Sequence, residues 1–343
     1  MIQQVTRNIT CTFLIALAAC NCVFSQGNLR IVFYNVENMF DIYDDPLTND
    51  EEFLPESSRH WNIARYQQKL NSVYKVIALA GGWEKPALIG LCEIENRKVL
   101  DDLLNLTPLN RDGIYQIIHK DSYDPRGIDV CLIYRKDCLN LLYYNYLYPK
   151  LFRSKKIKTR NVLYSKWLAG NDTIHLFLNH WPSRRGGVLA GEEERVILAR
   201  MIKEKGDSIL RASGNCAKII FAGDFNSLPS SREITIITGN KDDRTHNYVN
   251  LCSQFQNKAE GTYKFKGVWE TPDQIIVSNS LLSGCAGLVT AEKYCRILST
   301  RELLIRDRNY PGYKPFPTFN GFEYLGGYSD HLPLILDLIA SGN

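Results

Sequence analysis

Two short segments in the C-terminal half of the chain end or open apolar runs with groups that bind metal ions or move protons. Asp224 and Asn226 follow one apolar run, and Asp330 and His331 precede another. Both runs are short and aliphatic, as in buried strands, so their polar groups would lie at the rim of a sheet. Carboxylate, amide and imidazole groups at one rim predict metal-assisted hydrolysis, because they combine oxygen ligands for a hard cation with a proton carrier.

Further apolar runs upstream and between these segments carry polar groups at their ends. The residues at these ends are Asn35, Glu37, Glu93, His180 and Asp273. An isolated Asp-x-Asn or Asp-His pair is a common turn former, so a functional reading requires that several strand ends meet. Arg184 and Arg185 follow His180 closely and would add positive charge beside it.

In chain order, these motifs resemble the endonuclease/exonuclease/phosphatase superfamily, whose fold is that of DNase I. The resemblance covers nearly all of the chain after residue 25, in the segments Asn35-Val36-Glu37, Glu93, Asn179-His180, Gly223-Asp224-Phe225-Asn226, Asp273-Gln274-Ile275 and Ser329-Asp330-His331. Three of them extend into longer motifs that are similar to a group of secreted bacterial endonuclease-like proteins. Members of such a group share a fold more closely than a substrate, so the resemblance supports the mechanism better than the target.

The resemblance implies a catalytic role for five of these residues. Asp224 would orient or deprotonate the attacking water, and Asn226 would hold that water or a phosphate oxygen. His331, supported by the Asp273 carboxylate, would contact a non-bridging oxygen or donate a proton. His180 would lie against the phosphorane, at the position where the superfamily has His or Tyr.

A magnesium ion is the expected cofactor, with Mn²⁺ or Ca²⁺ as alternatives. Magnesium prefers oxygen ligands, so Glu93 is the best single ligand, with Glu37 or Asn35 nearby and Asp330 as a further candidate. Glu37 stands where many relatives carry Asp. Its longer side chain would shift the metal or leave it bound through Glu93.

Charge gives a limited guide to the substrate. The formal net charge is +4, which is close to balanced for 343 residues. Tight nonspecific binding to long nucleic acid usually requires a stronger basic surface. Candidate phosphate contacts are therefore local, at Arg126, Arg184 and Arg185 and in the basic run 153–158. A salt bridge at Arg126 and a solvated loop at 153–158 are the structural alternatives.

The N-terminus indicates export. Arg7 is the only charge before an apolar stretch from Ile9 to Ala19, which is too short to span a bilayer and is typical of a signal peptide. We expect residues 1–25 to be the signal peptide, with a lipoprotein signal that ends before Cys20 as the alternative. Residues 26–343 would form one domain. The protein would then be periplasmic, anchored to the outer membrane or extracellular, and we predict no obligate protein partner.

Seven cysteines follow residue 26, without a Cys-x-x-Cys motif and without histidines at zinc spacing. A structural zinc site is therefore not expected. Cys92, Cys131 and Cys216 lie in apolar runs and are interpreted as small buried core residues. An odd number leaves at least one thiol free. His119 and His175 lie in strand-like alternating segments and are interpreted as structural hydrogen-bonding residues.

Apolar runs and helical periodicity predict an α/β fold. The resemblance specifies a four-layer α/β/β/α sandwich, in which two packed mixed sheets are flanked by helices. The acidic segment 41–60 would be a surface loop over the cleft, with a calcium site there as the less favoured alternative. We expect helices near 62–80, 97–106 and 189–211, and strands near 29–36, 86–92, 128–134, 139–147, 160–168, 173–179, 217–223, 273–278 and 333–338.

The sequence thus predicts an exported magnesium-dependent phosphodiesterase, with nucleic acid as the first substrate and endonuclease activity. The alternative is sphingomyelinase or phospholipase C-like activity on a lipid head group, or phosphatase activity. The aromatic stretch 141–148 alternates like a strand and offers no exposed hairpin for a membrane, which places the lipid second. A catalytically inactive binding protein would have lost acids or histidines, and none is missing.

Overall fold

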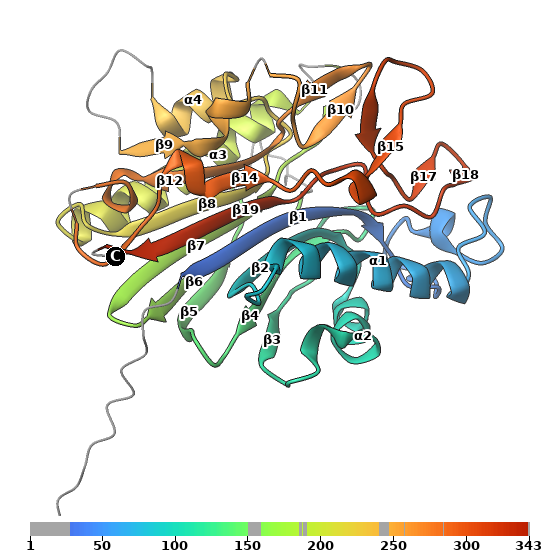
Figure 1. The fold of residues 1–343 in the computed structure, drawn as a ribbon, viewed down its shortest axis with the longest axis horizontal. Helices are drawn as coiled ribbons and strands as arrows, with labels where there is room; N and C mark the ends of the chain where they lie inside the picture. Colours follow the sequence, from blue (N-terminus) through green and yellow to red (C-terminus); the bar gives the residue numbers. More distant parts are fainter. Residues whose placement is uncertain are drawn as a thin grey trace, which may run out of the picture.

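Two β-sheets pack face to face between two layers of helices (Figure 1). The computed structural model describes residues 28–149, 159–184, 187, 191–239, 247–256, 258–283 and 285–341. The predicted α/β/β/α sandwich is confirmed. Within these described ranges, no helix is both long and apolar enough to cross a membrane.

The first sheet has β1 near its centre, parallel to β2 and antiparallel to β19. Its strand order is β13-β19-β1-β2-β4-β3, and β14 also pairs with β19. Because β1 and β2 are parallel neighbours, the residues at their C-terminal ends emerge at the same edge. The strands are β1 (Leu29–Met39), β2 (Leu88–Ile94), β3 (Tyr115–Ile118), β4 (Asp129–Arg135), β13 (Leu288–Val289), β14 (Cys295–Ile297) and β19 (Leu334–Ala340).

The second sheet has the strand order β5-β6-β7-β8-β12-β9. Strands β7 and β8 are parallel with His180 opposite Asp224, and the antiparallel β12 places Asp273 opposite Asp224 from the other side. Three polar residues thus meet at one sheet edge. The strands are β5 (Asn140–Leu147), β6 (Val162–Ala169), β7 (Asp172–His180), β8 (Lys218–Asp224), β9 (Tyr248–Asn250) and β12 (Asp273–Ser278).

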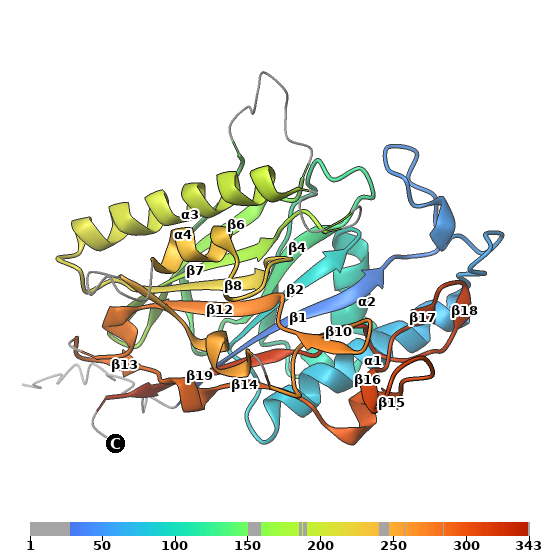
Figure 2. The same ribbon diagram turned by 90° about the horizontal axis from the view of Figure 1, so that it is seen from above.

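Helices cover the outer faces of both sheets. The helices α1 (Ile63–Gly81) and α2 (Arg97–Leu106) pack on the first sheet, and α3 (Glu192–Ala212) and α4 (Arg232–Thr238) pack on the second (Figure 2). The side chains of Asn62 and Asn96 cap α1 and α2. They accept hydrogen bonds from backbone N–H groups of the first helical turn, which have no partner within the helix. Between the sheets lies a third apolar layer that includes Phe33, Leu132 and Trp167.

Three small hairpins gather at the end of the sandwich where β1 ends (Figures 1 and 2). They are β10 (Tyr263–Phe265) with β11 (Val268–Glu270), β15 (Leu304–Arg306) with β16 (Tyr313–Pro315), and β17 (Phe319–Asn320) with β18 (Glu323–Tyr324). Short 3-10 helices span Glu51–Phe53, Pro108–Asn110, Leu251–Phe255, Asn279–Leu281, Glu292–Tyr294 and Arg301–Leu303. Strands of two or three residues are too short to show periodicity, so the sequence did not predict these hairpins.

The predicted long elements are confirmed, with ends displaced by a few residues. One pattern was wrong: β5 does not alternate, because Leu142, Tyr143 and Tyr144 are all exposed. A register shift between Leu141 and Tyr143 breaks the alternation at this edge strand. The loop from Asp41 to His60 lies at the surface as expected, although Asp41 and Asp50 within it are buried.

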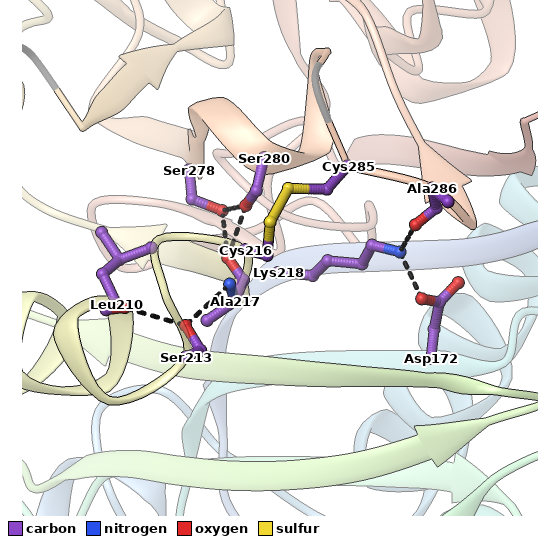
Figure 3. The surroundings of a disulfide bond; sticks show 10 residues. All are labelled: Asp172, Leu210, Ser213, Cys216, Ala217, Lys218, Ser278, Ser280, Cys285 and Ala286. Atoms are coloured by element: carbon purple, nitrogen blue, oxygen red, sulfur yellow. Dashed lines mark hydrogen bonds and ion pairs between the residues drawn. A yellow bond between two sulfur atoms is a disulfide. The ribbon is translucent and has the colours of Figure 1, made fainter.

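A disulfide joins Cys216, just before β8, to Cys285, which follows the 3-10 turn Asn279–Leu281 after β12 (Figure 3). The interpretation of Cys216 as a core residue was therefore wrong, because Cys216 is exposed and covalently paired. Cys92 and Cys131 are free and buried, as predicted. Near the bond, Lys218 pairs with Asp172 and donates a hydrogen bond to the carbonyl of Ala286 at 2.7 Å, so both segments are anchored together.

Candidate active site

Backbone irregularities at the ends of β1 and β2 aim two carboxylates toward the site. The register between these strands shifts between Asn35 and Met39, and the register between β2 and β4 shifts between Cys92 and Ile94. Within these shifts Glu37 (φ 57°) and Glu93 (φ 63°) have left-handed backbone conformations. Such conformations are costly for residues other than glycine and are concentrated at functional sites.

Glu37, Glu93 and Asp330 form a carboxylate cluster. Glu37 Oε2 accepts a hydrogen bond from the backbone N–H of Thr318 at 2.6 Å, and Glu93 Oε2 accepts one from Asn38 at 2.9 Å. Burial and the charge of Asp330 raise the pKa of Glu37 to about 7. Burial also raises the pKa of Asp330, and the charge of Glu93 adds to that shift. The three groups therefore repel one another in a site that excludes most water.

Lys69 brings a positive charge into this carboxylate cluster from helix α1. Its Nζ donates hydrogen bonds to Thr318 Oγ1 at 2.6 Å and to the Tyr328 carbonyl at 2.8 Å. Burial lowers the pKa of Lys69 to about 8, and the charges of Glu37, Asp330 and Glu93 counteract that shift. The sequence analysis did not identify Lys69 as a residue of the site. Its spacing from Leu70, Val73 and Ile77 places it on the buried face of the helix, and that was the available signal.

Asp224 lies at the C-terminal end of β8 and is held by two neighbours. Asn35 Nδ2 donates to Asp224 Oδ2 at 3.1 Å, and the backbone N–H of Asn226 donates to Asp224 Oδ1 at 2.8 Å. Burial and the charge of Asp273 raise the pKa of Asp224 to about 6. At neutral pH Asp224 is therefore a carboxylate with a pKa close to that of an efficient general base.

Gly223 lets β8 approach β7 directly before Asp224. A Cβ atom at this position would lie 2.2 Å from the carbonyl oxygen of Asn179, which is the paired residue on β7. Asn179 is itself buried and accepts a hydrogen bond from Trp181 Nε1 at 3.1 Å. A side chain at position 223 would therefore push apart the two strand ends that carry His180 and Asp224.

His331 and Asp273 form a buried ion pair. The distance between His331 Nδ1 and Asp273 Oδ2 is 2.7 Å. Burial alone would lower the pKa of His331, but the charges of Asp273, Asp330 and Asp224 raise it well above its usual range. His331 is thus an imidazolium that donates to Asp273. The ring of Tyr263 packs against it at a centroid distance of 4.9 Å.

His180 is neutral and faces two carboxylates. Its Nε2 lies 3.8 Å from both Glu93 Oε1 and Asp224 Oδ2. Burial lowers the pKa of His180 well below its usual range, and the charges of Arg160, Arg126 and His331 lower it further. A neutral ring keeps one nitrogen as a donor and one as an acceptor, and Nδ1 is buried without a hydrogen-bond partner among the described residues.

The carboxylate cluster fits a divalent cation. Glu37, Glu93 and Asp330 are oxygen ligands of the type that Mg²⁺ prefers, and the raised pKa values of Glu37 and Asp330 indicate a concentration of negative charge that a cation would stabilise. Asp224, Asp273 and His331 also have atoms within 4.8 Å of one another. A protonated His331 has no lone pair for a metal, so the carboxylate cluster is the better site.

The predicted arginines lie in different surroundings. Arg126 Nε is 3.7 Å from Asp124 Oδ1, and its charge acts on His180, so it lies near the site. Arg184 is ion-paired with Glu270. Arg185 and the basic run 153–158 lie outside the described residues. Sequence reasoning missed Arg160, whose Nε donates to the His180 carbonyl at 3.2 Å and which therefore fixes that strand end.

His119 and His175 each have a side-chain hydrogen-bond partner, as expected for histidines with a structural role. His119 Nε2 lies 3.2 Å from Asp129 Oδ2, and His175 Nδ1 lies 2.8 Å from the Tyr164 hydroxyl. Burial lowers the pKa of His175 to about 4. Neither residue contacts the strand ends described above. The structure thus brings Asn35, Glu37, Glu93, His180, Asp224, Asn226, Asp273, Asp330 and His331 together at one edge of the sandwich.

Comparison with known proteins gives the family of this chain. Its sequence matches the family model described as "Endonuclease/Exonuclease/phosphatase family" over residues 30–340. A search of curated protein sequences finds no match.

Solved structures share the fold. Humanized D. rerio TDP2 has a TM-score of 0.56 at 15% identity and covers 91% of this chain and 98% of its own. An endonuclease/exonuclease/phosphatase family protein from Bacteroides thetaiotaomicron has a TM-score of 0.54 at 14% identity, with coverages of 92% and 96%. A mannosyl-6-phosphatase from the same organism has a TM-score of 0.55 at 15% identity, with coverages of 91% and 99%. The chain therefore belongs to the endonuclease/exonuclease/phosphatase family and has its DNase I-like fold.

Proposed function

We propose that this protein is a divalent-metal-dependent phosphodiesterase. The observation that carries the proposal is the proximity of two sets of residues at one edge of the sandwich, where the strand ends of both sheets meet. One is the carboxylate cluster of Glu37, Glu93 and Asp330, and the other is the proton-handling set of Asp224 and the His331–Asp273 pair. Hydrolysis of a phosphodiester needs a deprotonated water, a countercharge and stabilisation of the leaving oxygen.

The carboxylate cluster would hold the cation, with Glu93 as its main ligand and Asp330 and Glu37 beside it. When bound, a divalent cation supplies positive charge that polarises the phosphoryl oxygens. Lys69 is hydrogen-bonded to Thr318 and Tyr328, and its charge lowers the pKa of Glu37 and Asp330, which favours their ionised forms. The backbone N–H groups of Thr318 and Asn38 orient Glu37 and Glu93.

Asp224 would accept the proton of the attacking water. Asn35 and the Asn226 backbone hold its two oxygens, so its remaining lone pairs face a fixed direction. Asn226 Nδ2 already donates to the Trp181 carbonyl at 3.0 Å, and its second hydrogen would hold the water or a phosphate oxygen. The imidazolium of His331 would donate from Nε2 to a non-bridging oxygen, because Nδ1 is engaged by Asp273.

Replacing Glu93 tests the metal site. In Glu93→Gln, hydrolysis of bis(p-nitrophenyl) phosphate should fall by at least about two orders of magnitude, because a lost ligand removes several kcal/mol of charge stabilisation. Folding should be retained by circular dichroism, and calorimetry should show weaker Mn²⁺ binding. Glu84→Gln, at an exposed position, is the matched control and should change neither quantity. Full wild-type activity in saturating EDTA would contradict the proposal.

Nucleic acid is the substrate that we propose first, with endonuclease action. The resemblance to endonuclease-like proteins supports it, and D. rerio TDP2, which has a TM-score of 0.55 with this chain at 16% identity, is complexed with a single-strand DNA product. The second candidate is phosphatase activity on a sugar phosphate. The similarity to a mannosyl-6-phosphatase supports it. Hydrolysis assays with Mg²⁺ would separate these candidates, with plasmid, single-stranded DNA, RNA, sphingomyelin and sugar phosphates as substrates.

We also propose that the protein is exported. The apolar segment from Ile9 to Ala19 supports export, although it lies outside the described residues. The Cys216–Cys285 disulfide adds support, because such bonds persist mainly in oxidising compartments. Mass spectrometry of protein from its native host should find an N-terminus at Gln26 or an acylated Cys20. Intact Met1 on the abundant mature form would contradict export.

A further inference from the structure

Tyr263 on β10 lies directly against His331. Its backbone forms an isolated antiparallel bridge with that of His331, and the centroids of the two rings are 4.9 Å apart with an angle of 34° between the ring planes. Beside this bridge, the backbone N–H of Leu332 donates to the carbonyl of Thr262 at 2.7 Å. The β10–β11 hairpin is therefore joined to the segment that carries His331, and one of its side chains belongs to the site.

The hairpin fixes the position of this tyrosine. Tyr263 is paired with Glu270 on β11, and a Cβ atom at position 261 would lie 2.3 Å from the Glu270 carbonyl oxygen. Gly261 thus allows the two strands to approach closely just before Tyr263. On the following residue, Lys264 Nζ donates to the carbonyl of Pro311 at 2.9 Å, which connects β10 to the β15–β16 hairpin. The backbone at Tyr263 is therefore held on both sides along the strand.

The hydroxyl end of Tyr263 faces carboxylates of the site. Burial raises the pKa of Tyr263 to about 12, and the charges of Asp330 and Asp224 add to that shift. The same two carboxylates raise the pKa of His331. Because the interaction between charges decreases with distance, these effects indicate that the outer ends of the two stacked rings face one region. That region lies between the carboxylate cluster and the candidate general base.

The Tyr263 hydroxyl is a donor whose acceptor is missing from the described part of the chain. It forms no hydrogen bond with a described residue, and its raised pKa keeps it protonated at neutral pH. Arg184, which the sequence predicts as a phosphate contact, is ion-paired with Glu270. Its charge is therefore compensated within the protein. A partly buried donor without a partner favours a ligand that brings an acceptor, and a phosphoester brings its phosphoryl oxygens.

We propose that Tyr263 is a further catalytic residue, whose hydroxyl donates a hydrogen bond to a non-bridging oxygen of the reacting phosphoryl group beside His331. The inference rests on the proposed phosphoester hydrolysis and adds a second donor to its site. A donor that is positioned before the reaction stabilises charge on these oxygens without reorganising in the transition state. The ring of Tyr263 supplies this positioning, because it packs on the imidazole while the hydroxyl extends past it.

Removal of the hydroxyl alone tests this role. In Tyr263→Phe, kcat/KM for bis(p-nitrophenyl) phosphate with Mg²⁺ should fall about tenfold, because a hydrogen bond to a charged oxygen is lost while the ring still packs on His331. The melting curve by circular dichroism should not change. Tyr313→Phe removes an exposed hydroxyl from β16 of the neighbouring hairpin, so this matched control should change neither quantity. Equal kcat/KM in the wild type and Tyr263→Phe would overturn the inference.

A second comparison separates the hydrogen bond from a purely structural effect of Tyr263. In the two stereoisomers of methyl p-nitrophenyl phosphorothioate, sulfur replaces one or the other non-bridging oxygen, and sulfur is a weak acceptor. For one isomer, the loss caused by Tyr263→Phe should shrink to within about twofold, since the bond is already weakened in the wild type, and for the other it should remain about tenfold. Equal losses on both isomers and on methyl p-nitrophenyl phosphate would indicate a structural effect and overturn the inference.

Phosphate binding distinguishes failure of this inference from failure of the proposed function. In calorimetry with Mg²⁺, inorganic phosphate should bind equally to the wild type and Tyr313→Phe, and about tenfold more weakly to Tyr263→Phe, whether or not any diester is hydrolysed. If no metal-dependent hydrolysis occurs, the proposed function fails, and this titration alone decides whether Tyr263 holds phosphoryl oxygens. Equal phosphate affinity in Tyr263→Phe, or no phosphate binding at all, would then overturn the inference.

Discussion

Asn35 donates a hydrogen bond from Nδ2 to Oδ2 of Asp224 at 3.1 Å, across the interface between the two sheets. Asn35 belongs to β1 of the first sheet and Asp224 to β8 of the second. This contact joins the strand end next to the carboxylate cluster to the strand end that would carry the general base. The relative position of these two sets therefore depends on how the sheets pack.

Loss of this contact should alter the pH dependence of activity. The hydrogen bond from Asn35 lowers the pKa of Asp224 against the larger effect of burial. In Asn35→Ala that pKa should rise, so the acid limb of the kcat/KM profile should move to higher pH, and kcat should fall by about tenfold or more. Asn71→Ala, on the exposed face of α1, is the control. An unchanged acid limb would show that Asp224 does not control it.

Lys69 gives a prediction about metal binding. Its charge lowers the pKa of both Glu37 and Asp330. Lys69→Met keeps most of the side-chain volume but removes the charge, so the two carboxyl groups should retain protons at higher pH. Calorimetric Mn²⁺ affinity should fall more steeply between pH 8 and pH 6 than in the wild type, because protons compete with the metal.

The same variant should also be less stable. Thr318 Oγ1 and the Tyr328 carbonyl each lose a buried hydrogen-bond donor, which should cost about 1–3 kcal/mol per unsatisfied group in the free energy of unfolding. Lys75→Met, on the exposed side of α1, is the matched control. Equal Mn²⁺ affinity in wild type and Lys69→Met at every pH would exclude an electrostatic role for Lys69.

The sequence indicated the strand ends because continuous apolar runs with polar ends are a local signal, as at Asp224 and Glu93. Features that depend on distant contacts were not accessible in this way. The pairing of Cys216 with Cys285 requires the spatial distance between two loops, and Lys69 is just one polar residue in an apolar helix stripe. The left-handed backbone at Glu37 and Glu93 arises from strand pairing and leaves no sequence pattern that distinguishes a bulge from a strand end.

The raised pKa of Asp224 predicts how stability changes with pH in metal-free protein. Its pKa is about 6 in the folded chain, against 3.8 for an unperturbed aspartate. The native state therefore binds the proton more tightly than the unfolded state. This contribution to stability is fully present below about pH 4 and is lost as pH rises through about 6. Urea unfolding in EDTA should show this loss in wild type, and Asp224→Asn should lack this component of the pH dependence.

The Cys216–Cys285 disulfide predicts a specific thiol count and a stability effect. Among the seven cysteines from Cys92 to Cys295, unfolded, non-reduced protein should have one disulfide, and peptide mapping should place it between residues 216 and 285. Because the bond closes a loop with a sequence separation of 69, the Cys216→Ser/Cys285→Ser pair should lower the free energy of unfolding by about 2–4 kcal/mol. Cys138→Ser is the matched control, because Cys138 is a free thiol.

The bond lies at the start of β8, seven residues before Gly223 and the site, so kcat of the folded double variant should stay close to that of the wild type. A double variant as stable as wild type, or alkylation of Cys216 without reductant, would show that this bond does not stabilise the protein in solution.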